Sequence, residues 1–219
     1  MKNTLPHVLL FVFSFLFSIP TYASSDEPWT WDEVRFGGIV EQGLDNSCGI
    51  ASLLTIMRMH FGDERYDEAS LLKKYMETAS EESIAESMKN GFSLLEMEKF
   101  STSLGYTTSK KILSFEELER LVAFVPVLVY LEVGKFRHFA VVRGIQKDVV
   151  LLGDPSRGNV EYTREEFLSE WGKLKGVSQE KGAGLMLVRS GVIPTQTLLT
   201  GPSTEEPSSF VEMQRQLVR

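Results

Sequence analysis

The first half of the chain carries apolar residues at helical spacing. In the stretch "CGIASLLTIMRMHFG", which begins at Cys48, they recur every three or four residues, and Gly62 follows the last of them. This spacing predicts a helix that buries one apolar stripe and ends at the glycine. Three residues before the helix are candidate N-caps, namely Asp45, Asn46 and Ser47.

Further segments of the first half have helical periodicity, and "SFEE" has the capping-box pattern of a helix start. Two short stretches look like strands instead, "VRFGGIV" at residues 34–40 and the segment 106–113. The additional helices that we expect are residues 66–76, 82–88, 91–104 and 114–121.

The second half changes to strand-like patterns. The run "VPVLVYLEV" is nearly continuous in apolar residues, and Gly134 and Lys135, which suit a tight hairpin, separate it from "FRHFAVVRG". Helices followed by antiparallel strands predict an α+β fold, in which N-terminal helices pack on a C-terminal antiparallel sheet. The expected elements are strands at residues 125–133, 136–144, 148–152, 160–162 and 184–188, and a helix at residues 164–171.

The two ends of the chain differ in composition from the part between them. Lys2, an uncharged apolar run at residues 8–19 and small residues up to Ala23 form the three parts of a secretory signal peptide. The run is shorter than the roughly 20 residues that span a bilayer as a helix. The C-terminal stretch "GPSTEEPSS" has no core-forming pattern and is typical of a disordered tail. We therefore expect a signal peptide at residues 1–23, a lead-in at 24–33, one folded domain at 34–190 and a tail at 191–219.

Composition and charge narrow the class of partner. Of the 219 residues, 42% are hydrophobic, which is enough for one folded core. The formal net charge of -7 argues against nucleic acid as the main partner, because phosphate binding needs a basic face. The signal peptide predicts export, to the periplasm of a Gram-negative bacterium or, as the alternative, out of the cell. We expect no membrane span after signal cleavage.

Cys48 is the single cysteine of the chain. An exported protein with one cysteine has no internal disulfide, although cysteines in oxidising compartments are usually paired. At the N-terminus of a helix, the macrodipole and the free N–H groups stabilise a thiolate. We therefore interpret Cys48 as a nucleophile, and an inert buried thiol is the alternative.

Elimination leaves one candidate for the base that would activate this thiol. Of three histidines, His7 lies in the signal peptide. His60 lies on the helix of Cys48, about 18 Å away along the axis. His138, in the strand "FRHFAVV", is the remaining candidate. The alternative is a hydrogen-bonded strand histidine without a chemical role.

Two further residues complete a candidate site. Asp154 ends the strand after that of His138 and would orient the imidazole; Asp148, near the start of that strand, is its rival, and Asp154 also suits a plain turn. Gln42, upstream of Cys48, would stabilise an oxyanion through its amide, together with the Cys48 N–H. A solvated loop amide is the alternative. The cysteine and the histidines lack metal-ligand spacing, so we expect no metal and no cofactor.

The motifs around these residues resemble a known family. Gln42, "CGIASLL" from Cys48, "HFAVVRG" from His138, "LLGDPSRG" around Asp154 and the later "TREEFLSEWGK" are similar to the papain-like bacteriocin-processing cysteine peptidases, which remove leaders after a double glycine. The resemblance covers roughly residues 34–189. It implies a papain-like fold, the same four residues as nucleophile, base, orienter and oxyanion donor, and a preference for small residues such as Gly-Gly before the cut.

The chain departs from that family in its setting. The family's domain usually begins an ABC exporter in the cytoplasm, whereas this sequence has a signal peptide and no P-loop. Stand-alone exported relatives include one of similar layout in bacterial functional-amyloid secretion systems. We therefore expect an exported cysteine endopeptidase with a peptide or protein substrate and a secretion-system component as a candidate partner. The alternatives are a non-cleaving, peptidase-like binding module of a secretion system, and another acyl transfer at the same thiol.

Overall fold

The computed structural model of the chain describes residues 35–134, 136–173, 178 and 180–189. The expected signal peptide (1–23), lead-in (24–33) and tail (191–219) lie outside the described residues. None of the helices in the described part is both long enough and apolar enough to cross a membrane.

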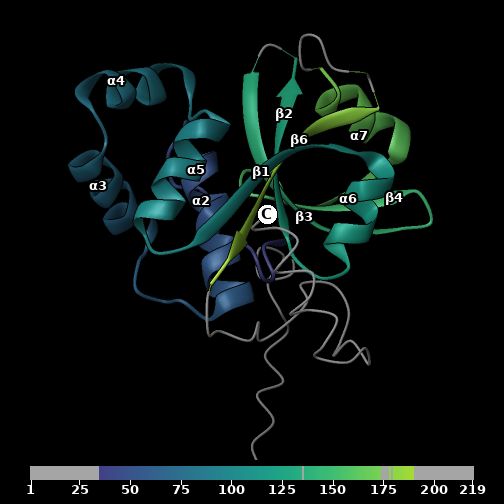
Figure 1. Cartoon of the computed structure of the whole chain (residues 1–219), viewed down its shortest axis with the longest axis horizontal. Helices are drawn as coiled ribbons and strands as arrows, with labels where there is room; N and C mark the ends of the chain where they lie inside the picture. Colours follow the sequence, from purple (N-terminus) through teal and green to yellow (C-terminus); the bar gives the residue numbers. More distant parts are fainter. Residues whose placement is uncertain (1–34, 135, 174–177, 179, 190–219) are drawn as a thin grey trace, which may run out of the picture.

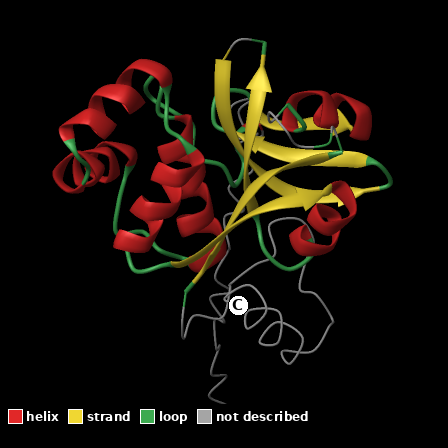
Figure 2. Ribbon diagram, turned by 45° about the horizontal axis from the view of Figure 1, so that its top comes forward, coloured by secondary structure: helices red, strands yellow, loops and turns green. Residues whose placement is uncertain are grey.

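Most helices come first along the described chain and most strands follow, as the hydrophobic pattern predicted. Figure 2 shows the helices in red and the strands in yellow. The helices are α2 (Cys48–Thr55), the π-helical segment η1 (Ile56–His60), α3 (Glu68–Thr78), α4 (Glu81–Asn90), α5 (Leu94–Ser103), α6 (Phe115–Val122) and α7 (Arg164–Trp171). The strands are β1 (Thr107–Ser114), β2 (Val127–Val133), β3 (Phe136–Gln146), β4 (Val149–Asp154), β5 (Gly158–Thr163) and β6 (Lys181–Val188).

The strand expected at residues 34–40 is wrong. The described part of this stretch forms turns and a bend, in which the Ile39 N–H donates to the Phe36 carbonyl at 2.9 Å. Gly38 has a φ of +70°, a left-handed conformation that glycine adopts readily and that ends an extended strand. The glycines of "VRFGGIV" therefore override the β-branched residues around them.

All six strands form one antiparallel sheet in the order β1-β6-β2-β3-β4-β5. β2 and β3 form the tight hairpin that the sequence predicted, since Val133 pairs with Phe136 and Gly134 has a φ of +64°. β3 and β4 are neighbours, and Asp154 pairs with Gly158 where β4 turns into β5. This order puts the strand of His138 beside the strand that ends in Asp154.

Each face of the sheet carries its own hydrophobic core. Successive side chains of a strand point to opposite faces. On β3, Phe139 and Val141 join the core under α2, α3 and α5, whereas Ala140 and Val142 join the core under α6 and α7. Figure 1 shows α2 to α5 on one side of the sheet and α6 and α7 on the other. The predicted α+β fold is confirmed, with helices on both faces of the sheet.

Helix α2 is the central helix of the molecule and is buried all round. All eight of its residues are buried, whereas the spacing of its apolar residues predicted a single buried stripe. Its small polar residues face other elements: the Ser52 hydroxyl donates to the Phe139 carbonyl of β3 at 3.3 Å, and Thr55 Oγ1 accepts from the Val40 N–H at 2.9 Å. Gly62, at a φ of +60°, ends the helical run as predicted.

Candidate active site

Cys48 lies in the first turn of α2, where backbone N–H groups have no partner within the helix. Ser47 precedes it as N-cap, but its side chain makes no capping bond. Instead the Ser47 hydroxyl lies 2.5 Å from Glu68 Oε1, and Glu68 Oε2 accepts from the Gly43 N–H at 2.8 Å. Glu68 of α3, which sequence reasoning did not single out, thus fastens the loop that carries Cys48.

His138 and Asp154 face each other across the neighbouring strands β3 and β4. The distance from His138 Nε2 to Asp154 Oδ1 is 3.0 Å, and the contact is closer to an ion pair than to a well-aligned hydrogen bond. The Asp154 side chain is fully buried and that of His138 is 14% exposed. The Cys48 side chain lies close enough to the same imidazole to raise its pKa, so the structure brings Cys48, His138 and Asp154 together.

The surroundings of His138 favour its protonated form. Burial lowers the pKa of the imidazole, but the contacts with Asp154 and Cys48 outweigh it and raise the pKa of His138 to about 9. Nε2 faces Asp154, so Nδ1 is the ring nitrogen left to exchange a proton with the thiol. The imidazole can therefore stay protonated beside the thiol at neutral pH.

Asp154 has two more partners in the turn "DPSRG", both missed by sequence reasoning. Ser156 donates to Oδ1 from its backbone N–H at 2.8 Å and from its hydroxyl at 2.7 Å. Arg157 donates to Oδ2 from Nε at 2.7 Å. Burial raises the pKa of Asp154. The contacts of the carboxylate with His138, Ser156 and Arg157 outweigh this effect and hold the pKa well below its usual range. An Asp followed two residues later by Ser was the available signal, as an Asx turn.

Gln42 reaches this turn through its main chain. Its N–H donates to the Pro155 carbonyl at 2.9 Å, beside Asp154. Its amide Nε2 donates to the Leu44 carbonyl at 2.9 Å and, more weakly, to that of Asp45 at 3.4 Å. The structure thus brings the Gln42 backbone to the site and directs its amide into its own loop. The amide NH2 of Gln42 thus makes one hydrogen bond of ordinary length, to Leu44, and one long contact, to Asp45.

The segment from Arg35 to Gln42, termed here the strap, is bonded to the turn after β4. Arg35 Nε donates to the Arg157 carbonyl at 2.7 Å. Asn159 Nδ2 donates to the Gly37 carbonyl at 2.9 Å, and the guanidinium of Arg143 donates to the same carbonyl at 3.1 Å. The bond from Arg35 ties the strap to the turn that holds Asp154, and the bonds to Gly37 tie it to β5 and β3.

The rival residues lie elsewhere. Asp148 sits in the turn before β4, at the opposite end of that strand from Asp154; its side chain is 73% exposed and lies 3.7 Å from Arg164. His60 ends η1 and is buried against Phe61, with ring centroids 4.7 Å apart. The structure therefore favours Asp154 over Asp148 and His138 over His60.

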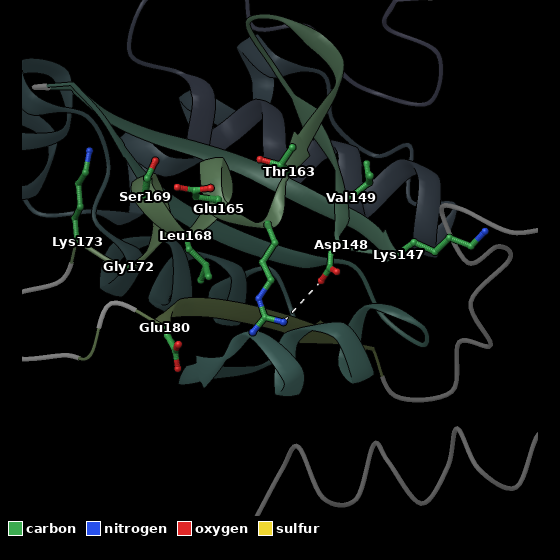
Figure 3. Close-up of a pocket in the computed structure, with 11 residues that line it drawn as sticks. Lys147, Asp148, Val149, Thr163, Glu165, Leu168, Ser169, Gly172, Lys173 and Glu180 are labelled. Carbon is green, nitrogen blue, oxygen red and sulfur yellow. Dashed lines mark ion pairs between the residues drawn. The ribbon is translucent and has the colours of Figure 1, made fainter.

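A cavity of about 1030 Å³ lies at the end of β4 that is remote from Asp154 (Figure 3). Its wall mixes charges of both signs, and the dashed line in the figure joins Arg164 and Asp148. Within the described residues, no group of three or more His, Cys, Asp or Glu could hold a metal ion. The cavity is lined by Lys147, Asp148, Val149, Thr163, Arg164, Glu165, Leu168, Ser169, Gly172, Lys173 and Glu180, which include none of the four candidate residues.

Comparison with known sequences agrees with this geometry. Residues 38–178 match the model of the peptidase C39 family. The chain is 34% identical over 139 residues to "Probable functional amyloid protease FapD" of Pseudomonas fluorescens and 32% identical over 139 residues to the protein of the same name from Pseudomonas aeruginosa. Each match covers 64% of this chain and 59% of the relative, so the chain matches somewhat over half the length of these curated relatives.

Comparison with solved structures supports the fold. The peptidase domain of Streptococcus ComA, described as a bi-functional ABC transporter involved in a quorum sensing pathway, superposes with a TM-score of 0.54 at 22% sequence identity. The match covers 69% of this chain and 97% of that domain. The papain-like fold is thus confirmed, and so is the expected class of cysteine peptidases at the level of the family: the chain belongs to the peptidase C39 family.

Proposed function

We propose that the chain is an exported cysteine endopeptidase that cleaves a peptide or protein substrate through Cys48, His138 and Asp154. One observation carries the proposal. The single cysteine of the chain lies at a helix N-terminus and contacts a histidine that is itself ion-paired with a buried aspartate. A nucleophile, a base and a group that orients the base are the parts that acyl transfer requires.

The first half of the reaction forms an acyl-enzyme. The Cys48 thiolate attacks the scissile carbonyl carbon and forms a C–S bond, and the carbonyl oxygen becomes an oxyanion. The tetrahedral intermediate then collapses as its C–N bond breaks. The His138 imidazolium donates its proton to the leaving amine, and Asp154 holds the ring so that this proton points at the nitrogen.

The second half restores the enzyme. Neutral His138 now accepts a proton from water as the water oxygen attacks the thioester carbon. The C–S bond breaks, the carboxylic acid product leaves, and Cys48 returns as a thiolate beside the protonated ring. The high pKa of His138, about 9, keeps the ring protonated at neutral pH.

Two donors would stabilise the oxyanion. The Cys48 N–H lies in the first turn of α2, and the helix dipole favours negative charge there. The amide of Gln42 is the second donor in the proposal. In the structure this amide donates to the Leu44 and Asp45 carbonyls, so the proposed role requires the side chain to rotate towards the substrate.

The proposed cut follows small residues such as Gly-Gly. The resemblance to the double-glycine peptidases implies this preference, and Cys48 is only 5% exposed. A substrate backbone without bulky side chains fits such a restricted approach. The signal-peptide pattern at residues 1–23 supports export to the periplasm. The similarity to two Pseudomonas proteins named functional amyloid proteases supports a role in maturing or secreting an exported protein, with a secretion-system component as partner.

The test compares the mature chain with its Cys48→Ala variant on internally quenched peptides that carry Gly-Gly or Leu-Leu at the same position. We expect the wild-type chain to cut after Gly-Gly at least tenfold faster than after Leu-Leu, and the variant to cut neither. Cleavage that continues unchanged in Cys48→Ala would remove the peptidase proposal.

A matched thiol measurement separates an enzyme from a binding module. Cys48 is the only thiol, so one mass adduct from iodoacetamide reports its reactivity. An activated thiolate reacts at pH 6, where an ordinary thiol is almost fully protonated. Peptide binding without reaction or cleavage at that pH would favour the non-cleaving module instead.

A further inference from the structure

The two oxygens of Asp154 serve two different cations. Oδ1 faces His138 Nε2 at 3.0 Å, whereas Oδ2 faces Arg157, with Nε at 2.7 Å and Nη2 at 2.6 Å. The carboxylate is fully buried, whereas the Arg157 side chain is 40% exposed, so water screens the guanidinium contact in part. Oδ1 also receives two bonds from Ser156. The imidazole therefore shares one negative charge with a guanidinium that is permanently charged.

Arg157 is itself held in place from several sides. Its N–H donates to Asp154 Oδ1 at 3.1 Å, and its guanidinium lies over the Tyr162 ring at 5.5 Å from the centroid. Tyr162 donates its hydroxyl to Glu170 Oε2 of α7 at 3.1 Å, and Arg35 of the strap donates to the Arg157 carbonyl at 2.7 Å. The guanidinium is therefore pre-organised against the carboxylate rather than free to leave it.

We propose that Arg157 is a positioning residue of the site, which fixes the plane of the Asp154 carboxylate and withdraws part of its charge from His138. The inference rests on the proposed function and adds to it a residue that touches neither the thiol nor the substrate. Because the guanidinium contacts Oδ2 alone, through Nε at 2.7 Å and Nη2 at 2.6 Å, Oδ1 stays directed at the ring, and this determines the direction of the His138 proton.

Competition for the carboxylate gives the proposal a signature in pH. Two charged partners face His138 in the described residues, Asp154 from β4 and Cys48 from α2; Arg157 acts on it through Asp154. Removing the guanidinium leaves the full negative charge of Asp154 to the imidazolium. His138 should then hold its proton to a higher pH, although the less constrained carboxylate makes catalysis slower.

The experiment alkylates Cys48 of the mature chain with iodoacetate across pH 5 to 10. An imidazolium attracts this anionic reagent, so the rate falls where His138 loses its proton. In Arg157→Gln we expect this upper limb to move up by about 0.5 to 1 pH unit. In Arg157→Lys, which keeps one charge but loses the fork, we expect a smaller upward shift.

Arg164→Gln is the matched control. Arg164 also pairs with a carboxylate, Glu116 at 2.6 Å, and lies over an aromatic ring, Phe115 at 4.3 Å, but at the far end of β5. In Arg164→Gln we expect the alkylation rate to fall at the same high pH as in the wild-type chain. An upper limb that is unchanged in folded Arg157→Gln would overturn the proposal. If that variant does not fold, an unchanged limb in Arg157→Lys would overturn it.

A second readout is independent of the proposed function. Titration of the His138 ring by NMR in the mature chain, with His138→Gln to assign its signal, reports the same proton without any reaction. An upward shift in Arg157→Gln supports the role of Arg157 even if the wild-type chain cleaves no peptide. A shift that is absent here while the chain cleaves peptides overturns the role of Arg157 alone.

Discussion

Asp154 and Asp63 are two buried aspartates that each hold two cationic groups. Asp154 pairs with His138 and Arg157, as described above. Asp63, three residues after the end of η1, accepts from Arg65 at 2.8 Å on Oδ1 and 2.7 Å on Oδ2, and from Arg189 at 3.1 Å. The pKa of Asp63 is held well below its usual range, mainly by the hydrogen bond from Arg65. In both clusters the carboxylate is buried and charged.

The clusters differ in whether a partner can lose its proton. Both cations on Asp63 are guanidiniums, which stay charged, and the third partner is the Tyr106 hydroxyl at 2.6 Å, whose pKa burial raises. The cluster joins the end of the helical run to Tyr106 before β1 and Arg189 after β6. One cation on Asp154 is instead an imidazole that contacts a thiol. The same electrostatic arrangement thus serves structure at Asp63 and suits proton transfer at Asp154.

Asp154→Asn should break the comparison most strongly. A neutral amide cannot stabilise the imidazolium, so we expect kcat/KM on a cleaved peptide to fall about 100-fold or more. Asp63→Asn should leave kcat/KM per folded molecule within about twofold of wild type. Peptide cleavage at pH 7 measures both variants. Equal losses in the two variants would show that the clusters do not differ in kind.

Asp63→Asn should instead reduce stability. It replaces a carboxylate whose side chain is 1% exposed by a neutral amide, which leaves one acceptor oxygen for two guanidiniums and a hydroxyl. Because Arg65 is 47% exposed and water can solvate it, we expect a loss of about 2 kcal/mol rather than the larger values of fully buried pairs. Urea unfolding at pH 7 measures this. Asp148→Asn, at a side chain that is 73% exposed, is the control and should change stability little. A loss no larger than that of the control would contradict the structural role of Asp63.

The contributions of the Asp154 and Asp63 clusters to the free energy of unfolding should differ in their pH dependence only at alkaline pH. The pKa of His138 is raised from 6.5 to about 9, so its stabilising contribution is complete below pH 6.5 and is lost as the pH rises through 9. We expect the free energy of unfolding to fall by about 1 to 2 kcal/mol across this window. The guanidiniums on Asp63 lose no proton there.

On the acid side, both aspartates have pKa values below the usual 3.8, so both contributions are lost as the pH falls below about 4. Urea unfolding at pH 4, 6, 7.5 and 9 measures the profile, with His138→Gln as control. A variant that keeps the full alkaline decline would assign that decline to groups other than His138.

Much of the fold follows from local patterns, and the misses have physical causes. The helix at residues 164–171 and the hairpin at Gly134 agree with prediction because capping residues and a glycine turn act within a few residues. The strand expected at residues 34–40 failed because its glycines allow a turn. α2 was predicted as amphipathic and is buried all round, since periodicity does not tell how many layers cover a helix.

The candidate site divides in the same way. One cysteine and three histidines leave few combinations, so the proximity of Cys48 and His138 could be anticipated; their catalytic roles stay predictions. Arg157 and Glu68 could not be assigned. The contact of Arg157 with Asp154 depends on the conformation of one turn. Glu68 lies on α3, about 20 residues along the chain from the loop to which it is bonded. No local pattern encodes either contact.

The bond from the Gln42 N–H to the Pro155 carbonyl constrains the number of residues in the loop that follows Gln42. The bond joins two main chains, so no side-chain replacement deletes it, proline at position 42 excepted. Exposed side chains between Gln42 and Cys48, such as that of Leu44, can be replaced without loss of this bond. An inserted or deleted residue between Gln42 and Cys48 would move the sulfur relative to the aspartate turn. This loop should therefore tolerate substitutions at its exposed positions but not insertions or deletions.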